Sequence, residues 1–465
     1  MTEMETNNFL MVKSIENALG REVLISEDMC EAMTLWDKMY RNKPSWLQKD
    51  AKSMNLPSAI ASELACQATL DFKSTISGSR RAEILNDEVY QNVIFDIRRW
   101  TELACALGGV VFKPYPDRNR LAVEYVQAHR FFPLAVDSRG EIVSAVFLDR
   151  FKRNGRVYSR LEEHILDHQG VTVTNRAFIG GGFWGLGKQI PLKDIPEWAN
   201  LAESVTLPGV TKPLFAYFKM PMANAVDPSS PMGASAYARS TDMIREADLQ
   251  FSRLLWEYEG GELAIDASVD ALLLENGDMK MPALNRRLFR ALDLDAGDSD
   301  LYSVFAPALR DNSYLSGLNE ILIRVEDLCG LARGTVSNTN NVARTATELQ
   351  LLRQRSYSTV SDIQKSLQRA LGQLVEGLDK LATVFALLPP GKCEVTFEFD
   401  DSIVTDRSTQ FEEMQKLVNQ GVLQKWEFRT WYLGETEEQA KARILESEQK
   451  EANREANQNE ENTPA

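Results

Sequence analysis

The stretch TATELQLLRQRSYSTVSDIQKSLQRALGQLVEGLDKLATVFALLPP, residues 345–390, predicts one long helix. It opens on a capping box, in which the Thr345 side chain can accept from the Glu348 amide while the Glu348 carboxylate reaches back to the Thr345 amide. Gly372 and Gly377 are the places where this helix could bend. More than forty residues then span roughly 60 Å before Pro389-Pro390 ends the helix. Apolar residues recur at helical steps along it: Val360, Ile363, Leu367, Leu371, Leu374, Leu378, Leu381 and Phe385.

Two amphipathic helices are predicted before it, over about 235–259 and 313–331. They flank about fifty residues of mixed character. The two helices can pack together only if this insert returns close to where it left, so the pattern indicates a helical hairpin with a small α/β excursion at its tip. The apolar positions are Ile244, Ala247, Phe251, Leu254, Leu255 and Tyr258 in the first helix and Leu315, Leu318, Leu322, Val325 and Leu328 in the second.

The periodicity of the rest of the chain predicts an α+β protein. Residues 45–107 show helical spacing that ends at Gly108-Gly109. From there to about 180 the period is two, in VVFKPY, RLAVEYV, IVSAVFLDRF and VTVTNRAF, which predicts a meandering antiparallel sheet. A strand, CEVTFEF, and a helical acidic segment over about 406–447 follow the long helix. The end, QKEANREANQNEENTPA, has few apolar residues and is predicted to be disordered.

Composition narrows the possible functions. The 465 residues suffice for two to four domains with sizeable cores. Fifty-two basic against 67 acidic side chains give a net charge of −15, which argues against a broad basic face that grips nucleic acid, although DNA that is only guided past is compatible with it. The five cysteines form no C-x-x-C pair, which favours a reducing compartment. No secretory signal or membrane-length apolar run is apparent, so a cytosolic protein without membrane contact is expected.

The loop GGGFWGLGKQ, residues 180–189, is one residue short of the phosphate-binding motif G-x-x-x-x-G-K-[ST]. Gln189 stands where a hydroxyl should hold magnesium, Phe183 and Trp184 add bulk to the cradle, and Pro191 falls where the helix should continue. A Gly-rich surface loop is therefore favoured. A nucleotide-driven enzyme that uses Gly182–Lys188 remains the alternative.

Two possible metal sites are weaker hypotheses than the nucleotide-binding loop. His164 and His168 have the i,i+4 spacing of zinc peptidases, but their neighbours favour a strand, on which they would lie roughly 13 Å apart. A zinc hydrolase is thus the third candidate. Asp400, Asp401 and Asp406 could hold a divalent ion, although an acidic turn before a helix is the commoner cause. No catalytic residue, cofactor or metal site is predicted.

The order of several strings resembles the portal proteins of long-tailed bacteriophages that infect Gram-positive bacteria (siphophage type). The likeness covers nearly the whole chain, and its specificity comes from the order and spacing of the strings. They are ACALGGVVFKPY (104–115), FFPL and IVSAVF (131–147), LFAYFKMPMANAVDPSSPMGASAYA (214–238), LFRALD (288–293), YLSGLNEILIRVEDLCGLARGT (314–335), and TATEL followed by SYSTV (345–360).

The resemblance implies a portal-protein fold assembled as a ring, usually of twelve subunits, at one capsid vertex. DNA would enter through its channel, driven by a terminase that is a separate ATPase, and leave through the tail. The implied domains are a wing (1–232), a first stem helix (233–261), a clip (262–311), a second stem helix (312–332), a tunnel loop (333–344), a long helix with a wing strand (345–405), a crown (406–448) and a disordered acidic tail (449–465). The tail has no counterpart in the resemblance.

The same plan implies the partners and the location of the protein. The partners are double-stranded DNA, terminase, head-tail connector proteins, scaffold and major capsid protein. The protein would assemble in the host cytoplasm and end in the virion.

The plan also implies site residues. Asn285, Arg286 and Arg287 fall in the clip, and Thr345 and Glu348 cap the long helix. Ile244, Phe251, Leu318, Leu322 and Val325 would make contacts between stem helices or between subunits. The DNA-facing residues of the tunnel loop would be Val336, Ser337, Asn338, Asn340, Asn341 and Val342.

Overall fold

The structure is a computed structural model, and two compact units divide the chain, Met1–Phe399 and Asp400–Ala465. It describes residues 8–47, 51–180, 182, 185–262, 264–268, 289–292, 302–305, 307–338, 346–399 and 407–446.

Short helices form the first part of the larger unit. The second of them begins after Ser26, whose side chain accepts from the Met29 amide, and acidic residues in its first turn favour the helix dipole. The helices are α1 (Asn8–Leu19), α2 (Glu27–Tyr40), α3 (Leu56–Ala68), α4 (Arg80–Leu85), α5 (Gln91–Phe95) and α6 (Ile97–Leu107), with η1 (Ser45–Leu47) before α3 and the π-helical η2 (Asn86–Tyr90) before α5.

A strand interrupts this helical region, which the sequence had not predicted. β1 (Lys73–Ser77) pairs with β14 (Glu394–Glu398) in antiparallel register, with Ser74 opposite Phe397. Five residues are too few to show a clear period, and their partner lies more than three hundred residues further along the chain. The predicted strand near CEVTFEF is confirmed as β14.

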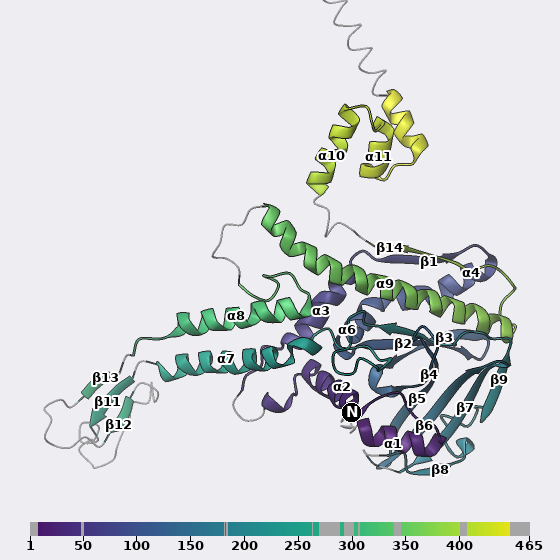
Figure 1. Ribbon diagram of the computed structural model, residues 1–465, viewed down its shortest axis with the longest axis horizontal. Coiled ribbons are helices and arrows are strands. Elements are labelled where there is room, and N and C mark those ends of the chain that lie inside the picture. The colour runs from purple at the N-terminus through teal and green to yellow at the C-terminus, as the bar shows by residue number, and fades with distance from the viewer. Residues whose placement is uncertain are drawn as a thin grey trace, which may run out of the picture. The chain divides into compact units, whose positions relative to one another are not determined.

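The predicted antiparallel meander is confirmed and splits into two sheets (Figure 1). One has the order β10-β2-β3, from β2 (Gly109–Asp117), β3 (Arg120–Gln127) and β10 (Ala216–Lys219). The other has the order β4-β5-β6-β7-β8, with β9 also paired to β7, from β4 (Phe131–Val136), β5 (Ile142–Arg153), β6 (Arg156–Asp167), β7 (Gly170–Ile179), β8 (Lys188–Ile190) and β9 (Ser204–Pro208). Single helical turns are η3 (Ala128–Arg130), η4 (Leu192–Asp194) and η5 (Ala238–Ser240).

The long helix α9 (Ala346–Val384) has 39 residues and contacts β10 and β2. Its buried residues repeat at helical steps, as predicted: Ile363, Leu367, Leu371, Leu374 and Leu378. The predicted end at Pro389 is wrong, because the helix closes after Val384. The Leu387 amide bonds to the Ala382 carbonyl and Ala386 has φ of 49°, which is the geometry of a left-handed C-terminal cap.

Two glycines come into direct contact where α6 turns into β2. Gly108 ends α6 with φ of 86°, as predicted, and a Cβ on it would collide with the Gly233 carbonyl. A Cβ on Gly233 would in turn collide with the Gly108 carbonyl. The Gly233 amide donates to the Tyr217 hydroxyl at 3.0 Å, and the Ala236 amide donates to the Cys105 carbonyl at 2.8 Å. The segment that leads into the next helix is thereby fixed to the end of α6.

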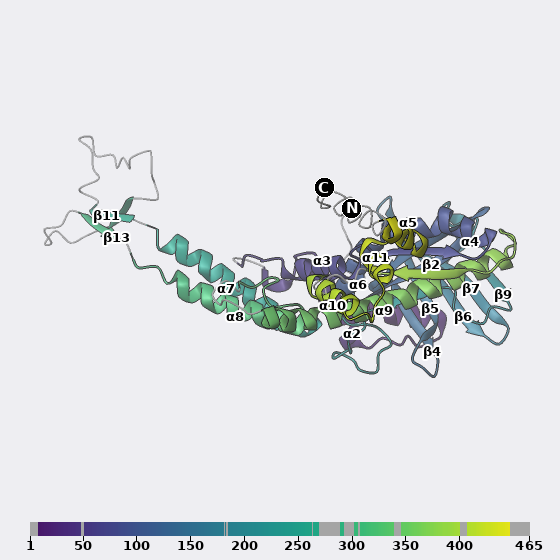
Figure 2. The same ribbon diagram turned by 90° about the horizontal axis from the view of Figure 1, so that it is seen from above.

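That next helix, α7 (Thr241–Gly260), lies beside α8 (Asp311–Cys329) in both views, which confirms the predicted hairpin (Figures 1 and 2). α7 begins six residues later than predicted because η5 precedes it. Within the insert the structure describes three strands, β11 (Ala264–Ser268), β12 (Phe289–Leu292) and β13 (Tyr302–Phe305). β11 pairs with β12 in parallel and with β13 in antiparallel orientation.

The smaller unit is helical, as predicted for 406–447. It contains α10 (Arg407–Asn419), α11 (Lys425–Leu433) and a helix over 437–446. A capping box between Gln424 and Glu427 begins α11. Aromatic rings link the helices, with Phe411 5.3 Å from Phe428 and 5.0 Å from Tyr432 between centroids. Among the side chains described in this unit, only that of Ala440 is fully buried.

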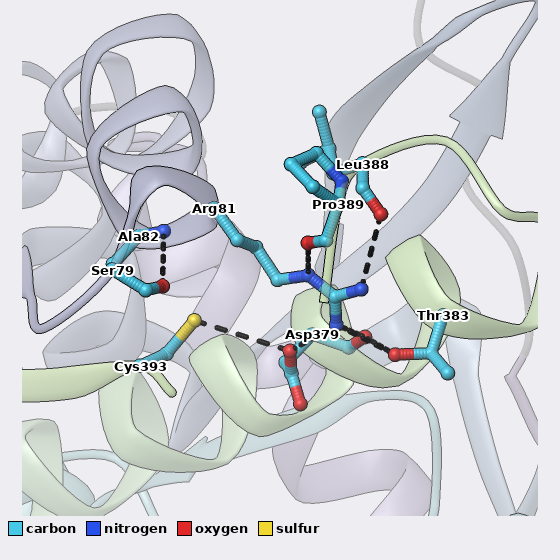
Figure 3. Close-up of polar contacts among 8 residues, drawn as sticks. All are labelled: Ser79, Arg81, Ala82, Asp379, Thr383, Leu388, Pro389 and Cys393. Carbon is cyan, nitrogen blue, oxygen red and sulfur yellow. Dashed lines mark hydrogen bonds and ion pairs between the residues drawn. The ribbon is translucent and has the colours of Figure 1, made fainter. Parts of the chain in front are cut away.

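Arg81 of α4 joins the helical region to the end of α9 (Figure 3). Its side chain is 4% exposed. The guanidinium donates at 2.6 Å each to the Pro389 carbonyl, the Asp379 carboxylate and the Thr383 hydroxyl, and at 3.1 Å to the Leu388 carbonyl. A buried arginine thus binds the side chains of the last turns of α9 and the carbonyl groups of the segment that follows the helix.

Replacing Arg81 by Ala should lower the free energy of unfolding by about 2 kcal/mol or more, because a buried charge-assisted network loses its donor. Arg80→Ala is the matched control, since Arg80 is exposed and pairs with Glu83 on the surface at 2.8 Å. Thermal unfolding at equal protein concentration measures both. Equal Tm values for the two variants would contradict this role of Arg81.

Candidate functional site

The facing surfaces of α7 and α8 form the first part of the site. Ile244 and Val325 are fully buried within the single chain, and Leu318 and Leu322 are nearly so. Phe251 is half-buried against the same core. These predicted stem residues therefore belong to the core of one subunit. Other apolar side chains of the two helices stay exposed in the single chain: Trp256, Tyr258, Leu315 and Leu328.

Acidic residues interrupt the buried faces of both helices, beginning with Asp248 on α7. Asp248 is buried, and its carboxylate accepts from Trp46 Nε1 at 3.0 Å and from the Met54 amide at 2.8 Å. Burial raises the pKa of Asp248 above its ordinary value, although these hydrogen bonds act in the opposite direction. The contacts attach the segment before α3 to the middle of α7.

Glu257, near the end of α7, closes the base of the insert. It accepts from the Arg310 amide at 3.0 Å and from the Arg310 guanidinium at 3.1 and 2.7 Å. Hydrogen bonding to Arg310 lowers the pKa of Glu257 and raises that of Arg310. Since Arg310 directly precedes α8, this pair holds together the two chain crossings between the hairpin and its insert.

Glu326, in the last turn of α8, is completely buried. One carboxylate oxygen accepts from the amides of Gly334, Val336 and Ser337 at 3.1, 2.6 and 2.8 Å. The other accepts from the Ser337 hydroxyl at 2.7 Å and from the Gly334 amide at 3.2 Å. The chain after α8 is therefore folded around this carboxylate.

This arrangement bears on the predicted DNA-facing residues of the segment 333–344. Ser337 is one of them, yet in the structure it is 8% exposed and its hydroxyl donates to Glu326. The Asn338 amide donates to Asn319 Oδ1 at 2.6 Å. Arg333 pairs with Asp327 at 2.9 Å.

Several predicted residues lie outside the part that the structure describes. They are Asn340, Asn341, Val342, Thr345 and the clip residues Asn285, Arg286 and Arg287, and the side chain of Glu348 is likewise not described. α9 begins at Ala346, directly after the predicted cap residue.

The near-phosphate loop has the wrong backbone for a nucleotide cradle where it is described. Lys188 begins strand β8 and pairs with Ile179, whereas the motif requires a helix at that point. The Gly182 and Gly185 carbonyls accept from Arg150 at 2.5 and 3.4 Å, and the Leu186 amide donates to the Ser14 hydroxyl at 3.0 Å. A phosphate-binding loop directs backbone N–H groups at the phosphates. Here backbone carbonyl groups are directed at the Arg150 guanidinium instead, an arrangement that does not suit a polyphosphate.

Of the two histidines, His164 lies on a strand, as predicted, whereas His168 lies in the turn that follows β6. His164 lies in β6 and contacts Glu162 at 2.8 Å, and Glu162 also pairs with the buried Lys113 at 2.8 Å and with Arg160 at 3.0 Å. Burial alone would raise the pKa of Glu162, but Lys113, His164 and Arg160 together lower it well below its ordinary value. His164 thus belongs to an internal ion-pair network.

Within the described ranges, no group of three or more His, Cys, Asp and Glu side chains is placed to hold a metal ion. Asp400, Asp401 and Asp406 lie outside those ranges. A search of the described helices finds none with the length and apolar character needed to cross a bilayer.

Comparison with known proteins identifies the family. The chain matches the family described as "Phage portal protein, SPP1 Gp6-like" over residues 69–455. It therefore belongs to this portal protein family, whose members are structural components of the virion and not enzymes, and its function is that of a portal.

Two further comparisons add little to the family match. No curated protein sequence matches the chain. Among solved structures, a chain from "Neck of native GTA particle computed with C12 symmetry" is similar over 90% of this chain and 97% of that chain, with 10% sequence identity and a TM-score of 0.39. This TM-score is too low to define a shared fold.

The loop geometry predicts that the purified protein does not hydrolyse ATP with magnesium above the buffer rate. Lys188→Ala should behave as the wild type does, because Lys188 lies in a strand and not at a helix N-terminus. Turnover by the wild type that the Lys188→Ala variant loses would show that the loop binds nucleotide after all.

Proposed function

We propose that this portal protein forms a closed ring, dodecameric in the complete particle, at one capsid vertex of a long-tailed phage with a Gram-positive host. The ring is assembled in the host cytoplasm. Terminase drives double-stranded DNA inward through its channel, and the tail later releases it. The observation that supports a ring is the hairpin of α7 and α8, which we call the stem hairpin. Its inner face is buried within one chain, while apolar side chains of both helices remain exposed.

These exposed side chains favour contact between neighbouring subunits. Leu315 and Leu328 are 44% and 38% exposed and both lie on α8. Trp256, on α7, is 64% exposed. Exposed large apolar side chains on both helices are available for contact with a neighbouring subunit, and a head-to-tail contact repeated by rotation closes a ring.

The charge of the chain suits a channel through which DNA must slide. A net charge of −15 leaves few surplus cations to bind phosphates, and phosphate contacts are what make nucleic-acid binding tight.

By this proposal the wing comprises 1–232 and 345–405, the clip 262–311 meets terminase and the head-tail connectors, and the crown 406–448 faces the capsid interior. Scaffold and major capsid protein are the partners at the vertex.

A double substitution at the exposed leucines of α8 tests the ring. Leu315→Asp combined with Leu328→Asp should shift the protein from a single closed assembly towards monomers, since burying the remaining exposed area of each Leu contributes about 1 kcal/mol and a charge there opposes the contact. Ser316→Asp on the same helix is the control, because Ser316 is exposed and polar. Analytical ultracentrifugation separates the species. A wild type that is monomeric at micromolar concentration would refute the ring.

Variants of Leu322 and Val325 suit this test less well. Both side chains are buried inside the hairpin, so Asp there would unfold the stem before it could report on assembly.

The tunnel loop is tested by deletion of residues 339–343. This deletion begins after Asn338 because Ser337 belongs to the turn around Glu326. We expect rings to form normally, while phage particles that carry the deletion package or retain less DNA than the wild type does. Full-length genomes kept at the wild-type level would contradict a DNA-facing role.

A further inference from the structure

Glu326 lies where a carboxylate is unfavourable on two counts. It is in the last turn of α8, where the helix dipole disfavours negative charge, and it is completely buried. Its place on the helix continues the buried series Leu318, Leu322 and Val325. An apolar residue would satisfy packing there, so the carboxylate must serve another purpose.

That purpose is visible in the donors that surround it. Three backbone amides and one hydroxyl point at the two oxygens, all from Gly334, Val336 and Ser337. Successive amides that converge in this way form an anion-binding nest, here occupied by a side chain of the same protein. The donors follow Glu326 by eight to eleven residues, so the chain has to reverse direction to present them.

The reversal is fixed at other points as well. Gly330 ends α8 with φ of 72°, and a Cβ on it would collide with Thr359 of α9. The Arg333–Asp327 pair and the bond from the Asn338 amide to Asn319 attach the turn to the side of α8. Glu326 is the buried member of this set, while Asp327 and Arg333 lie nearer the solvent.

We propose that Glu326 is the positioning residue of the tunnel loop: it holds Gly334–Asn338 against α8, so that the loop leaves the stem at a defined point. The DNA-facing part of the loop then begins after Asn338, and Ser337 serves the stem. This inference rests on the proposed function for its link to DNA, but the turn itself does not depend on that function.

Substitutions at Glu326 should have graded effects. Ala leaves the Val336 and Ser337 amides without their acceptor, while the Gly334 amide keeps only the Ser337 hydroxyl at 3.1 Å. Gln keeps one oxygen for amides but offers an NH₂ group to Gly334 and Ser337, so it holds the turn less well. Glu320→Gln is the matched control, since Glu320 lies on the same helix and is exposed.

Hydrogen–deuterium exchange of the full-length assembled protein tests the turn. We expect the Gly334, Val336 and Ser337 amides to exchange at least about tenfold faster in Glu326→Ala than in the wild type, and to a smaller degree in Glu326→Gln. The α8 amides and the Glu320→Gln protein should match the wild type. Unchanged exchange of these three amides in a folded Glu326 variant would overturn the proposal. If Glu326→Ala does not fold, Glu326→Gln decides.

Complementation of a portal-deficient phage tests the consequence. Glu326→Gln should form rings as the wild type does but yield fewer DNA-filled particles, whereas Glu320→Gln should yield the normal number. Faster exchange with a normal number of filled particles would overturn the positioning role. If the wild-type chain itself forms no rings and rescues no phage, the proposed function fails, and the exchange result still decides the turn.

Discussion

The contact between Gly108 and Gly233 is the constraint on which the larger unit depends. Backbone meets backbone there with no room for a side chain on either residue. The close approach sets the segment after β10 against the end of α6, while β10 itself pairs with β2 directly after Gly108. α9 then lies over β10 and β2, and α7 starts a few residues beyond Gly233. The hairpin of α7 and α8 thus takes its starting direction from this contact, and a side chain at Gly108 or Gly233 would push the end of α6 and the segment before α7 apart.

The hairpin of α7 and α8 is held by polar contacts as well as by the apolar contacts between its helices. Asp248, Glu257 and Glu326 each sit on a buried face, and each receives backbone or side-chain donors from a segment outside the helices. A buried carboxylate is tolerated only when its oxygens are satisfied, so each one specifies a single way for its segment to pack. Apolar contacts are far less selective about register. Three carboxylates therefore fix the segment before α3, the base of the insert and the turn after α8.

Local periodicity explains what could be predicted from the sequence. The hairpin, the meander and the long helix have strong periods and clear end signals such as Gly108, so reasoning from neighbouring residues found them. β1 was missed because its evidence lies in a partner strand at the other end of the chain. The predicted end of α9 was late because Leu387 and Leu388 continue the apolar pattern although the backbone has already turned.

The polar side chains of the site could have been found in part. Asp248 and Glu326 each lie four residues after a buried apolar residue, Ile244 and Leu322, on the face that the helix hides. An acidic residue in such a stripe signals a buried acceptor in need of donors. Arg81 gives no such signal, because its partners are the last turns of α9 and carbonyl groups of the segment after that helix, and only the folded chain brings them near.

The sparse interior of the smaller unit affects how the whole chain loses its structure. Cooperative melting requires that each part lose much of its buried contact when another part opens. The larger unit has a continuous core that reaches from α1 to the end of α9, whereas the described side chains of 407–446 bury only Ala440 completely. Calorimetry of such a chain should record more than one transition, and a single melting temperature would describe the larger unit alone. Heat absorbed by the three C-terminal helices would be small, because enthalpy and heat capacity of unfolding scale with the contacts and surface released.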